Sequence, residues 1–546
     1  MSRHALMRIA AVLVILSVSA GSRAAPVLFT RGLMTDVKPT DTPDTGRPVT
    51  DIRLTACRGE FEPFSLAIHA PAGGSWRIGV SELKRVAGGE PIPAKQVEAA
   101  IVRWGETPGY LGKYSRVTDY CLHPEETSIR IDPGRTAWLW LTVHVPASAP
   151  PGQYRGELTL SDGPARTVVP IELRVLPLVL GRVPDVQFCL LYTTALGQYH
   201  TAATRAERLP AAKALYRELA DHGMTCIAPK CSDWPYRPGH FEGLEACVRE
   251  AMAAGLDGPV LWNMSALINT RKGGKNFAHF DGKCDNWDEK RDLANLTEIV
   301  GEVRRRAAAG GWPEVVFATL DEPGTQTENL PMRDLRLRVL LPETLKAVAD
   351  AGARGATTMS EPVDEKHNRQ WVKRPDELRE LWDLSRPYCH VRIYAYGYAQ
   401  GKTNLAHEQA DCRRRGHEMW FYHNPASMGR DRHCARLYFG LWGWKVGAQG
   451  LTSWTYPGGR TVQWELIREG IDDFRYVAAM ERLVAAKGGA EAWRASARRF
   501  LDEMKAAIRI NADGFITDWA GAAPDLAAFR ERAVRLIAAR EGAADE

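Results

Sequence analysis

Strand and helix patterns alternate from Pro184 to about residue 480, and this rhythm restricts the fold more than any other feature of the sequence. Apolar, strand-like runs alternate with helical patterns that often end on glycine, the usual stop signal of a helix. The eight runs are Val186–Tyr192, Met224–Ala228, Pro259–Trp262, Val315–Leu320, Gly355–Met359, His390–Tyr394, Glu418–Tyr422 and Gly450–Trp454. Eight strand–helix units fit a (β/α)8 barrel, whereas an open doubly wound sheet normally stops at roughly five or six strands. We therefore predict an α/β fold with a TIM-type barrel over residues 184–480.

The chain before this region has a different pattern. Short β-rich runs separated by Gly and Pro clusters occupy residues 26–180, and Trp138-Leu-Trp-Leu-Thr-Val143 shows the two-residue period of a strand. This pattern predicts an N-terminal β-sandwich, with a boundary between Leu176-Pro177 and Val183-Pro184. Residues 481–546 are rich in Ala and Arg and predict a C-terminal helical extension.

Residues 1–24 have the pattern of a signal peptide. Basic residues precede the apolar run Ile9–Ala20, which is shorter than the roughly 20 residues that cross a bilayer. Cleavage after Ala20 or Ala24 would export the protein to the periplasm or the outside of the cell. No later segment has the pattern of a membrane span, so none is expected in the mature chain.

Composition and motifs exclude several classes of protein. A formal net charge of +5 over 546 residues does not indicate a nucleic-acid partner. Ten cysteines are too few for a disulfide scaffold, although Cys226 and Cys231 are close enough in sequence to pair. The zinc-protease, P-loop, dinucleotide and nucleophile-elbow motifs are missing, so we expect neither a metal nor an organic cofactor. The oligomeric state cannot be derived from these patterns.

Two acidic residues follow the fourth predicted barrel strand. The apolar run Val315–Leu320 leads directly into Asp321-Glu322-Pro323. Acids in this position are costly unless they face a polar cavity or a partner, and the active site of a TIM barrel lies at the carboxyl ends of its strands. Pro323 is expected to hold Glu322 in an extended conformation. We therefore predict that Asp321 and Glu322 are catalytic.

Aromatic and amide side chains lie at the ends of the other predicted strands. Flat rings suit the C–H face of a sugar, and amides suit its hydroxyl or acetamido groups, so a carbohydrate site is expected. The predicted substrate-binding residues are Tyr192, Trp262, Asn263, Tyr394, Tyr396, Tyr422, Asn424, Trp454 and Tyr456. Glu361 and Glu465 are candidates for a second carboxylate, with surface or capping roles as the alternative.

Four segments carry a resemblance to a known family. They are Arg58-Gly-Glu-Phe-Glu-Pro-Phe64, Val145-Pro-Ala-Ser-Ala-Pro-Pro-Gly-Gln-Tyr-Arg-Gly156, Asp321-Glu-Pro323 and Trp464-Glu-Leu-Ile-Arg-Glu-Gly-Ile-Asp-Asp-Phe-Arg-Tyr476. Trp420-Phe-Tyr-His-Asn424 and Gly450-Leu-Thr-Ser-Trp454 also fit, and the chain resembles glycoside hydrolase family 123 over most of its mature length. The resemblance implies a β-sandwich joined to a (β/α)8 barrel and exo-acting β-N-acetylgalactosaminidase activity, with the adjacent Asp321 and Glu322 as catalytic residues.

The adjacency of the two acids favours one mechanism. Ordinary retaining glycosidases hold two carboxyl groups about 5–5.5 Å apart across the scissile bond, whereas Cα atoms of neighbouring residues are only about 3.8 Å apart. Such neighbours can serve one side of the sugar, with the substrate's own acetamido group as nucleophile, Glu322 as acid and base, and Asp321 orienting the acetamido group. The alternatives are a two-carboxylate glycosidase acting on a different sugar and a non-catalytic glycan-binding protein.

Overall fold

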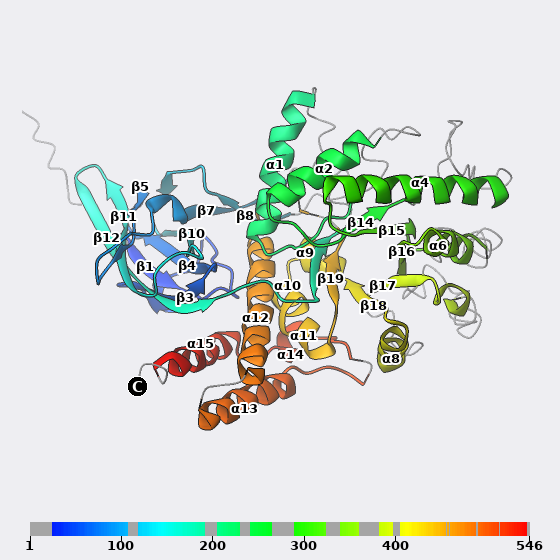
Figure 1. The fold of residues 1–546 in the computed structure, drawn as a ribbon. Coiled ribbons are helices and arrows are strands. Elements are labelled where there is room, and N and C mark those ends of the chain that lie inside the picture. The colour runs from blue at the N-terminus through cyan, green and yellow to red at the C-terminus, as the bar shows by residue number, and fades with distance from the viewer. Residues whose placement is uncertain are drawn as a thin grey trace, which may run out of the picture.

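The computed structural model describes residues 25–107, 118–191, 205–229, 241–264, 289–323, 339–359, 382–396, 405–454, 456–457, 459–486, 490–512 and 514–542. Within these residues the chain is a mixed α/β protein with several sheets and a helical C-terminal region (Figure 1). The first part of the chain forms two packed sheets, and the second part forms a curled parallel sheet with helices around it.

Two six-stranded sheets make up the N-terminal part. The first has the order β2-β1-β4-β10-β7-β8, and the second has the order β3-β12-β11-β5-β9 with β6 paired to β11. The strands are β1 (Val27–Thr30), β2 (Arg47–Pro48), β3 (Ile52–Arg58), β4 (Phe61–Ala70), β5 (Gly74–Val80), β6 (Lys84–Arg85), β7 (Val97–Glu106), β8 (Thr118–His123), β9 (Ser128–Ile131), β10 (Arg135–His144), β11 (Gly152–Asp162) and β12 (Ala165–Val179). One apolar core takes side chains from both sheets, so the sheets pack face to face.

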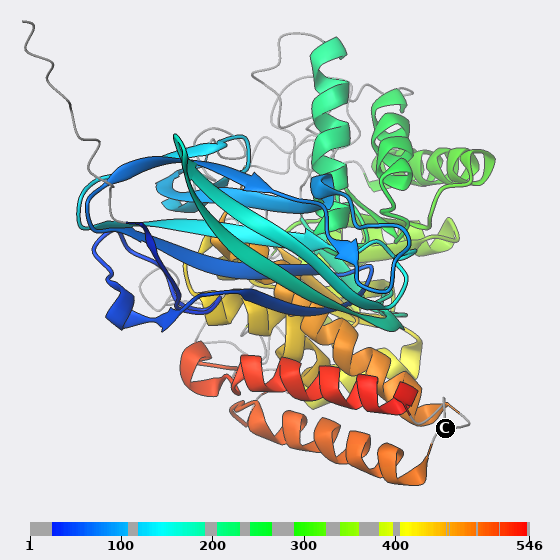
Figure 2. The ribbon, with the colours of Figure 1, turned by 90° about the vertical axis from the view of Figure 1, so that its left-hand side faces the viewer.

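The first sheet is buried on both of its faces. On β10, Leu139 and Leu141 point into the core between the two sheets, whereas Trp138 and Trp140 belong to the core shared with the rest of the protein. The alternation predicted for this strand is therefore present, and both of its faces are apolar because both are covered. Figure 2 shows these sheets in front of the second part of the chain, with the C-terminal helices below them.

A seven-stranded parallel sheet forms the second part, in the order β13-β19-β18-β17-β16-β15-β14. Its strands are β13 (Gln187–Leu190), β14 (Val260–Asn263), β15 (Val315–Leu320), β16 (Arg354–Met359), β17 (Cys389–Ala395), β18 (Glu418–Tyr422) and β19 (Gly450–Ser453). The bounds of each strand differ by at most a few residues from those of the corresponding predicted run. The predicted strand Met224–Ala228 is present only as single bridges, from Ala228 to Leu191 and from Ile227 to Val260. The sheet curls as a half-barrel, and its two edge strands are β13 and β14.

Helices lie around the convex face of this sheet, and further helices follow it in the sequence (Figure 1). They are α1 (Arg205–Asp221), α2 (Glu242–Ala253), α4 (Glu289–Gly310), α6 (Leu341–Asp350), α8 (Leu405–Arg415), α9 (Asn424–Met428), α10 (Arg432–Leu437), η5 (Tyr438–Trp442), α11 (Gly443–Val446), α12 (Val462–Ala485), α13 (Glu491–Ala507), α14 (Trp519–Ala522) and α15 (Leu526–Gly542), with short 3-10 turns η1 (Pro43–Thr45) and η2 (Ala94–Gln96). No helix in the described ranges is both long enough and apolar enough to cross a bilayer.

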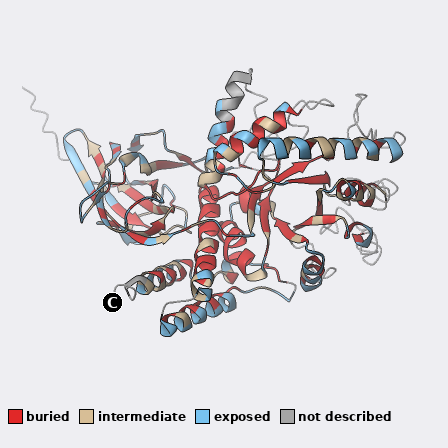
Figure 3. Cartoon of the chain, in the orientation of Figure 1, coloured by how far each residue is buried: buried red, intermediate tan, exposed pale blue. Residues whose placement is uncertain are grey.

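Helix α12 lies between the two parts of the molecule. The hydroxyl of Thr461 caps its first turn by accepting a hydrogen bond from the Trp464 N–H at 3.1 Å. Figure 3 shows most of the helix as buried, although its buried residues include Glu465, Glu469 and Asp473. The predicted boundary between residues 480 and 481 falls inside this helix, so α12 is one continuous element across it.

Buried ion pairs join α12 to both ends of the chain. Asp473 pairs with Arg436 at 2.7 Å and with Arg530 of α15 at 2.8 Å. Arg530 also pairs with Glu60 of the first part at 2.6 Å, and Glu60 accepts a hydrogen bond from the Tyr476 hydroxyl at 2.7 Å. The C-terminal helices are therefore tied to the two-sheet part rather than extending away from it.

Carboxylates are in excess in this ionic cluster. Burial raises the pKa of Glu62 well above its ordinary value, and the neighbouring Glu60 carboxylate raises it further. Burial also raises the pKa of Glu60, to about 7. The Oε2 atom of Glu62 has no hydrogen-bond partner among the described residues, and Arg530 is 3.8 Å away. A raised pKa in the folded state means that the folded protein binds protons more tightly, so this contribution to stability is lost as the pH rises above the ordinary value of 4.5.

We predict that Glu62→Gln raises the free energy of unfolding at pH 8 by about 1 kcal/mol or more, because glutamine copies the protonated carboxyl group without its titration. At pH 4 the same substitution should change little. Denaturant unfolding at the two pH values measures the difference, and Glu90→Gln, at an exposed position, is the matched control. A Glu62→Gln variant that is less stable than the parent at pH 8 would show that the ionised carboxylate stabilises the fold.

Candidate active site

The carboxyl ends of β15, β16, β18 and β19 and the residue after β13 surround a cavity of about 270 Å³. Strand β15 is buried along its whole length, as expected for a parallel strand covered on both faces, and it delivers the two acids at its end. The residues that line the cavity are Leu191, Asp321, Glu322, Thr358, Tyr422, Asn424 and Trp454. Five of the predicted site residues, Asp321, Glu322, Tyr422, Asn424 and Trp454, therefore line one cavity.

Thr358 holds both acids from the neighbouring strand. Its hydroxyl donates a hydrogen bond to Oδ1 of Asp321 at 2.6 Å and accepts one from the backbone N–H of Glu322 at 2.9 Å. Thr358 is only 5% exposed, and both acids are half-buried. One hydroxyl therefore sets the position of the Asp321 carboxylate and of the Glu322 backbone at the same time.

Tyr422 contacts the second acid directly. Its hydroxyl donates a hydrogen bond to Oε1 of Glu322, and its ring is buried at the end of β18. This bond restricts the rotation of the Glu322 carboxyl group. Tyr422 therefore positions the Glu322 carboxyl group through its hydroxyl, in addition to any contact that its ring makes with a ligand.

The backbone of Glu322 differs from the sequence expectation. Pro323 was expected to keep Glu322 extended, but the φ angle of Glu322 is +40°. A non-glycine residue in this region is strained, and such strain is characteristic of functional sites where surrounding contacts impose it. The hydrogen bond from the Glu322 N–H to Thr358 is one of the contacts that hold this conformation.

Asn424 and Trp454 form the opposite wall. The backbone N–H of Trp454 donates to Oδ1 of Asn424 at 3.1 Å, which fixes the orientation of the amide. Its oxygen is therefore engaged, and its NH2 group has no hydrogen-bond partner among the described residues. An amide held in this way offers donors to a ligand in the cavity.

Four of the predicted aromatic side chains do not line this cavity, and Asn263 does not line it either. Trp262 is 3% exposed and packs edge-on against Phe241 and Phe317 in the core outside the sheet. Tyr394 is buried and donates a hydrogen bond to Glu408 of α8 at 2.5 Å. Because side chains alternate along a strand, both residues point toward the helices and away from the concave face.

Tyr396 and Tyr456 are the other two. Tyr396 packs among aromatic rings that include Trp442 and Trp519, and its hydroxyl donates to the carbonyl of Ile516 at 2.9 Å. Tyr456 is 7% exposed and donates to Glu218 of α1 at 2.9 Å. The prediction that these rings form sugar platforms is wrong for the cavity that the structure shows.

The remaining candidates lie elsewhere or outside the described residues. Asn263 is 3% exposed and is not among the residues that line the cavity. Glu465 is fully buried and pairs with Arg460, Arg468 and His222, so it is not a second carboxylate of this site. Burial alone would raise its pKa, but the Arg460 and Arg468 guanidinium groups hold it well below the ordinary value. Tyr192 and Glu361 fall outside the residues that the structure describes.

Sequence analysis did not identify Thr358 and Leu191. The signal for Thr358 is the polar pair Thr357-Thr358 near the end of an otherwise apolar strand. Cys226 was a candidate for a disulfide, but it is a buried free thiol, and Cys231 lies outside the described residues. The described side chains offer one group that could chelate a cation, His123 with Glu125 and Glu126, on the two-sheet part. Glu126 already pairs with Arg103 at 2.6 Å.

The fold is similar to that of a solved glycoside hydrolase. A family 123 glycoside hydrolase from Clostridium perfringens, studied for glycolipid glycan hydrolysis, superposes with a TM-score of 0.59 over 91% of this chain and 95% of that chain. The chain shares its fold with a glycoside hydrolase. The sequence identity is 11%, so the likeness concerns the fold alone.

A second solved structure is much less similar. The catalytic domain of a β-amylase from Paenibacillus polymyxa has a TM-score of 0.33 at 10% identity, covering 54% of this chain and 99% of that one. No family model and no curated protein sequence matches the chain.

We predict that Thr358→Val destabilises the protein by about 1–3 kcal/mol, because it removes the donor to Asp321 and leaves the half-buried Glu322 N–H without its acceptor. Thr319→Val is the matched control. Thr319 is fully buried on the adjacent strand β15, and its hydroxyl has no partner among the described residues, so this change should be neutral or stabilising. Chemical denaturation measures both variants, and equal effects would mean that the Thr358 hydrogen bonds contribute nothing.

Proposed function

We propose that the protein is an exported, exo-acting glycoside hydrolase that removes terminal β-linked N-acetylgalactosamine by substrate-assisted, retaining catalysis. The main support is that Asp321 and Glu322 line one cavity. Thr358 forms hydrogen bonds with both residues, and Tyr422 forms one with Glu322. The fold shared with a glycoside hydrolase supports the reaction class. The N-terminal pattern of residues 1–24 supports export.

The architecture that we propose for the second part is a closed (β/α)8 barrel. This proposal is supported by the segment around Ile227, which lies between the two edge strands β13 and β14 of the half-barrel sheet. The Thr225 N–H donates to the carbonyl of Phe188 at 2.9 Å, and the Leu261 N–H donates to that of Ile227 at 2.9 Å. With this segment as the eighth strand, β13 and β14 would both gain neighbours, and the cavity would lie at the carboxyl end of the ring.

In the first step Glu322 acts as the general acid. Its proton passes to the glycosidic oxygen while the bond from that oxygen to the anomeric carbon breaks, and the acetamido oxygen of the substrate forms a bond to the same carbon. The Tyr422 hydroxyl restricts the Glu322 carboxyl group during this transfer. The aglycone leaves as an alcohol, and the sugar is held as a cyclic oxazolinium ion.

Asp321 stabilises this cation. Its carboxylate, restrained by the Thr358 hydroxyl, accepts a hydrogen bond from the acetamido N–H and offsets the positive charge. In the second step Glu322 removes a proton from water as the water oxygen bonds to the anomeric carbon, and the bond from that carbon to the acetamido oxygen breaks. The anomeric configuration is retained, because two displacements occur in sequence, and Glu322 regains its proton.

The size of the cavity supports exo action. About 270 Å³ is close to the lower end of small-molecule sites, which run from roughly 300 to 1,000 Å³, and suits a single sugar residue. The Trp454 side chain and the Asn424 amide in the opposite wall provide an apolar surface and hydrogen-bond donors for that residue.

We predict that Glu322→Gln lowers kcat on an alkyl β-N-acetylgalactosaminide by about 10³-fold or more, because no proton reaches the leaving oxygen. On an aryl substrate with a good leaving group the first step should recover, and the loss should be smaller. Glu314→Gln, at the exposed position just before strand β15, is the control and should retain the parent activity. Initial rates on both substrates measure the difference.

The acetamido group tests the mechanism itself. The matched aryl β-galactoside, which lacks this group, should be turned over at a negligible rate. Equal rates on the two sugars would exclude substrate assistance and favour a two-carboxylate glycosidase. Saturable glycan binding without turnover of any substrate would instead indicate a glycan-binding protein.

A further inference from the structure

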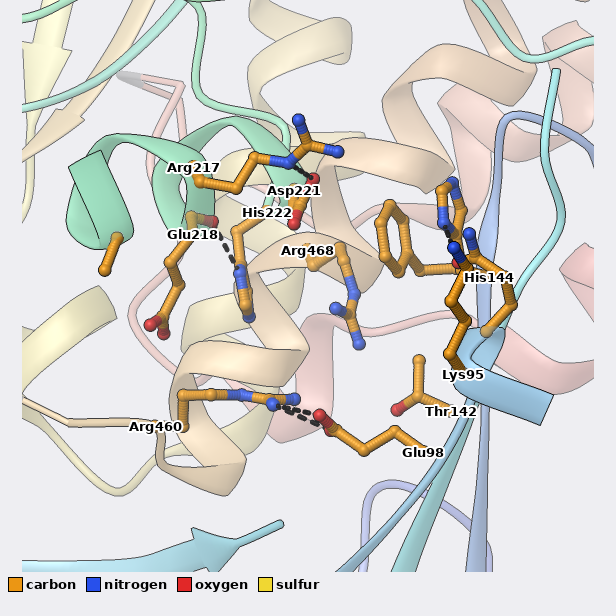
Figure 4. A pocket seen from close by; sticks show the side chains of 13 residues that line it. Lys95, Glu98, Thr142, His144, Arg217, Glu218, Asp221, His222, Arg460 and Arg468 are labelled. Carbon is orange, nitrogen blue, oxygen red and sulfur yellow. Dashed lines mark hydrogen bonds and ion pairs between the residues drawn. The ribbon is translucent and has the colours of Figure 1, made fainter. Parts of the chain in front are cut away.

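A second cavity, of about 360 Å³, lies at the junction between the two-sheet part and helices α1 and α12 (Figure 4). Phe61 comes from the segment Arg58–Phe64, and Arg468 comes from the segment Trp464–Tyr476. Both segments carry the family resemblance, yet neither contributes to the candidate active site. None of the residues that line the two cavities is shared.

Three carboxylates in the wall of this junction cavity already interact with donors of the protein. Both oxygens of Glu98 accept from Arg460, at 2.7 and 2.9 Å. Glu218 accepts from the Tyr456 hydroxyl at 2.9 Å and from the Trp464 indole N–H at 3.1 Å. Asp221 pairs with Arg217 at 3.3 Å. Each of these carboxylates therefore has at least one donor from the protein, although both bonds to Glu218 go to its Oε1.

Within the described ranges, the guanidinium group of Arg468 has a hydrogen-bond acceptor for only one of its nitrogens. Its side chain is 3% exposed, and its Nη2 pairs with Glu465. Glu465 also pairs with Arg460 at 2.8 Å and with His222 at 3.2 Å, so several donors share one carboxylate. The Nε and Nη1 of Arg468 form no hydrogen bond with the described residues, and Nε is itself enclosed by protein atoms. Figure 4 shows the guanidinium group projecting into the space between Arg460 and Thr142, so its terminal nitrogens are the donors on the cavity side.

The opposite wall also presents donors. The Oε1 of Gln96 accepts from Nδ1 of His144 at 2.6 Å, so the amide oxygen is engaged and its NH2 group has no partner in the described part of the chain. Lys95 has no ion pair there either, and its position is exposed at the edge of the cavity. The buried Thr142 hydroxyl is likewise without a partner among the described residues.

We propose that the junction cavity binds a small carboxylate, whose oxygens accept hydrogen bonds from Arg468, Gln96 and Lys95. A buried guanidinium with an unmatched N–H lacks part of its hydrogen bonding, and a carboxylate supplies charge-assisted acceptors of the right geometry. The carboxylate belongs to a sugar acid or to a simple organic acid, and both share this chemistry. The site is separate from the proposed glycosidase centre and does not depend on it.

The test is calorimetric titration of the intact mature protein with D-glucuronate, acetate and D-glucose at pH 7 and low salt. Glucuronate should bind saturably with one site per chain, and glucose should not bind. Binding of acetate with similar affinity would identify the carboxylate alone as the ligand group, and its absence would identify the sugar acid. Failure of both carboxylates to bind would overturn the proposal.

A double variant at the cavity edge tests the donors. Lys95→Ala with Gln96→Ala should weaken glucuronate binding about tenfold, because two donors are lost. Lys84→Ala, whose side chain is 76% exposed, is the matched control and should bind as the parent does. Glu322→Gln should also bind as the parent does. Loss of binding in Glu322→Gln, or unchanged binding in the double variant, would place the carboxylate elsewhere and contradict the proposal.

Discussion

Helix α12 carries ionised side chains where almost no water reaches them, and the two parts of the molecule are joined by the groups that satisfy those charges. A buried charge without a partner is costly, so each must meet a partner from another element. Asp473 meets Arg436 and Arg530, and Glu465 meets Arg460. Arg530 and Arg460 also pair with Glu60 and Glu98 of the two-sheet part. These contacts bring helix α15 and the two-sheet part onto one helix.

The candidate active site depends on a different constraint, the pairing of β15 with β16. The register of this pair shifts between Ala318 and Leu320, just before the acids, and such irregularities redirect the side chains that follow. Thr358 of β16 then bonds to Asp321 and to the Glu322 backbone. The positive φ angle of Glu322 is thus supported by a neighbouring strand, which is how local strain persists in a folded protein.

Much of the fold could be predicted from the sequence because parallel strands are short apolar runs with clear ends. The bounds of β15 and β18 match the predicted runs Val315–Leu320 and Glu418–Tyr422. The position of the acids at a strand end was predictable for the same reason. The sequence did not reveal the backbone of Glu322 or the role of Thr358, since both depend on which strand lies beside β15.

The errors at Trp262 and Tyr394 have one physical origin. Residues at a strand end were treated as equivalent, although successive side chains point to opposite faces. On β17, Val391 and Ile393 face the inside of the curled sheet, so Tyr394 must face the helices, where Glu408 accepts its hydroxyl proton in a hydrogen bond. On β18, Trp420 and Tyr422 both face the inside, which brings Tyr422 to Glu322. The position of a residue along its strand determines at which end of the sheet it lies, and the alternation of side chains determines on which face. A residue of this site must lie at the carboxyl end and also point to the inside of the sheet.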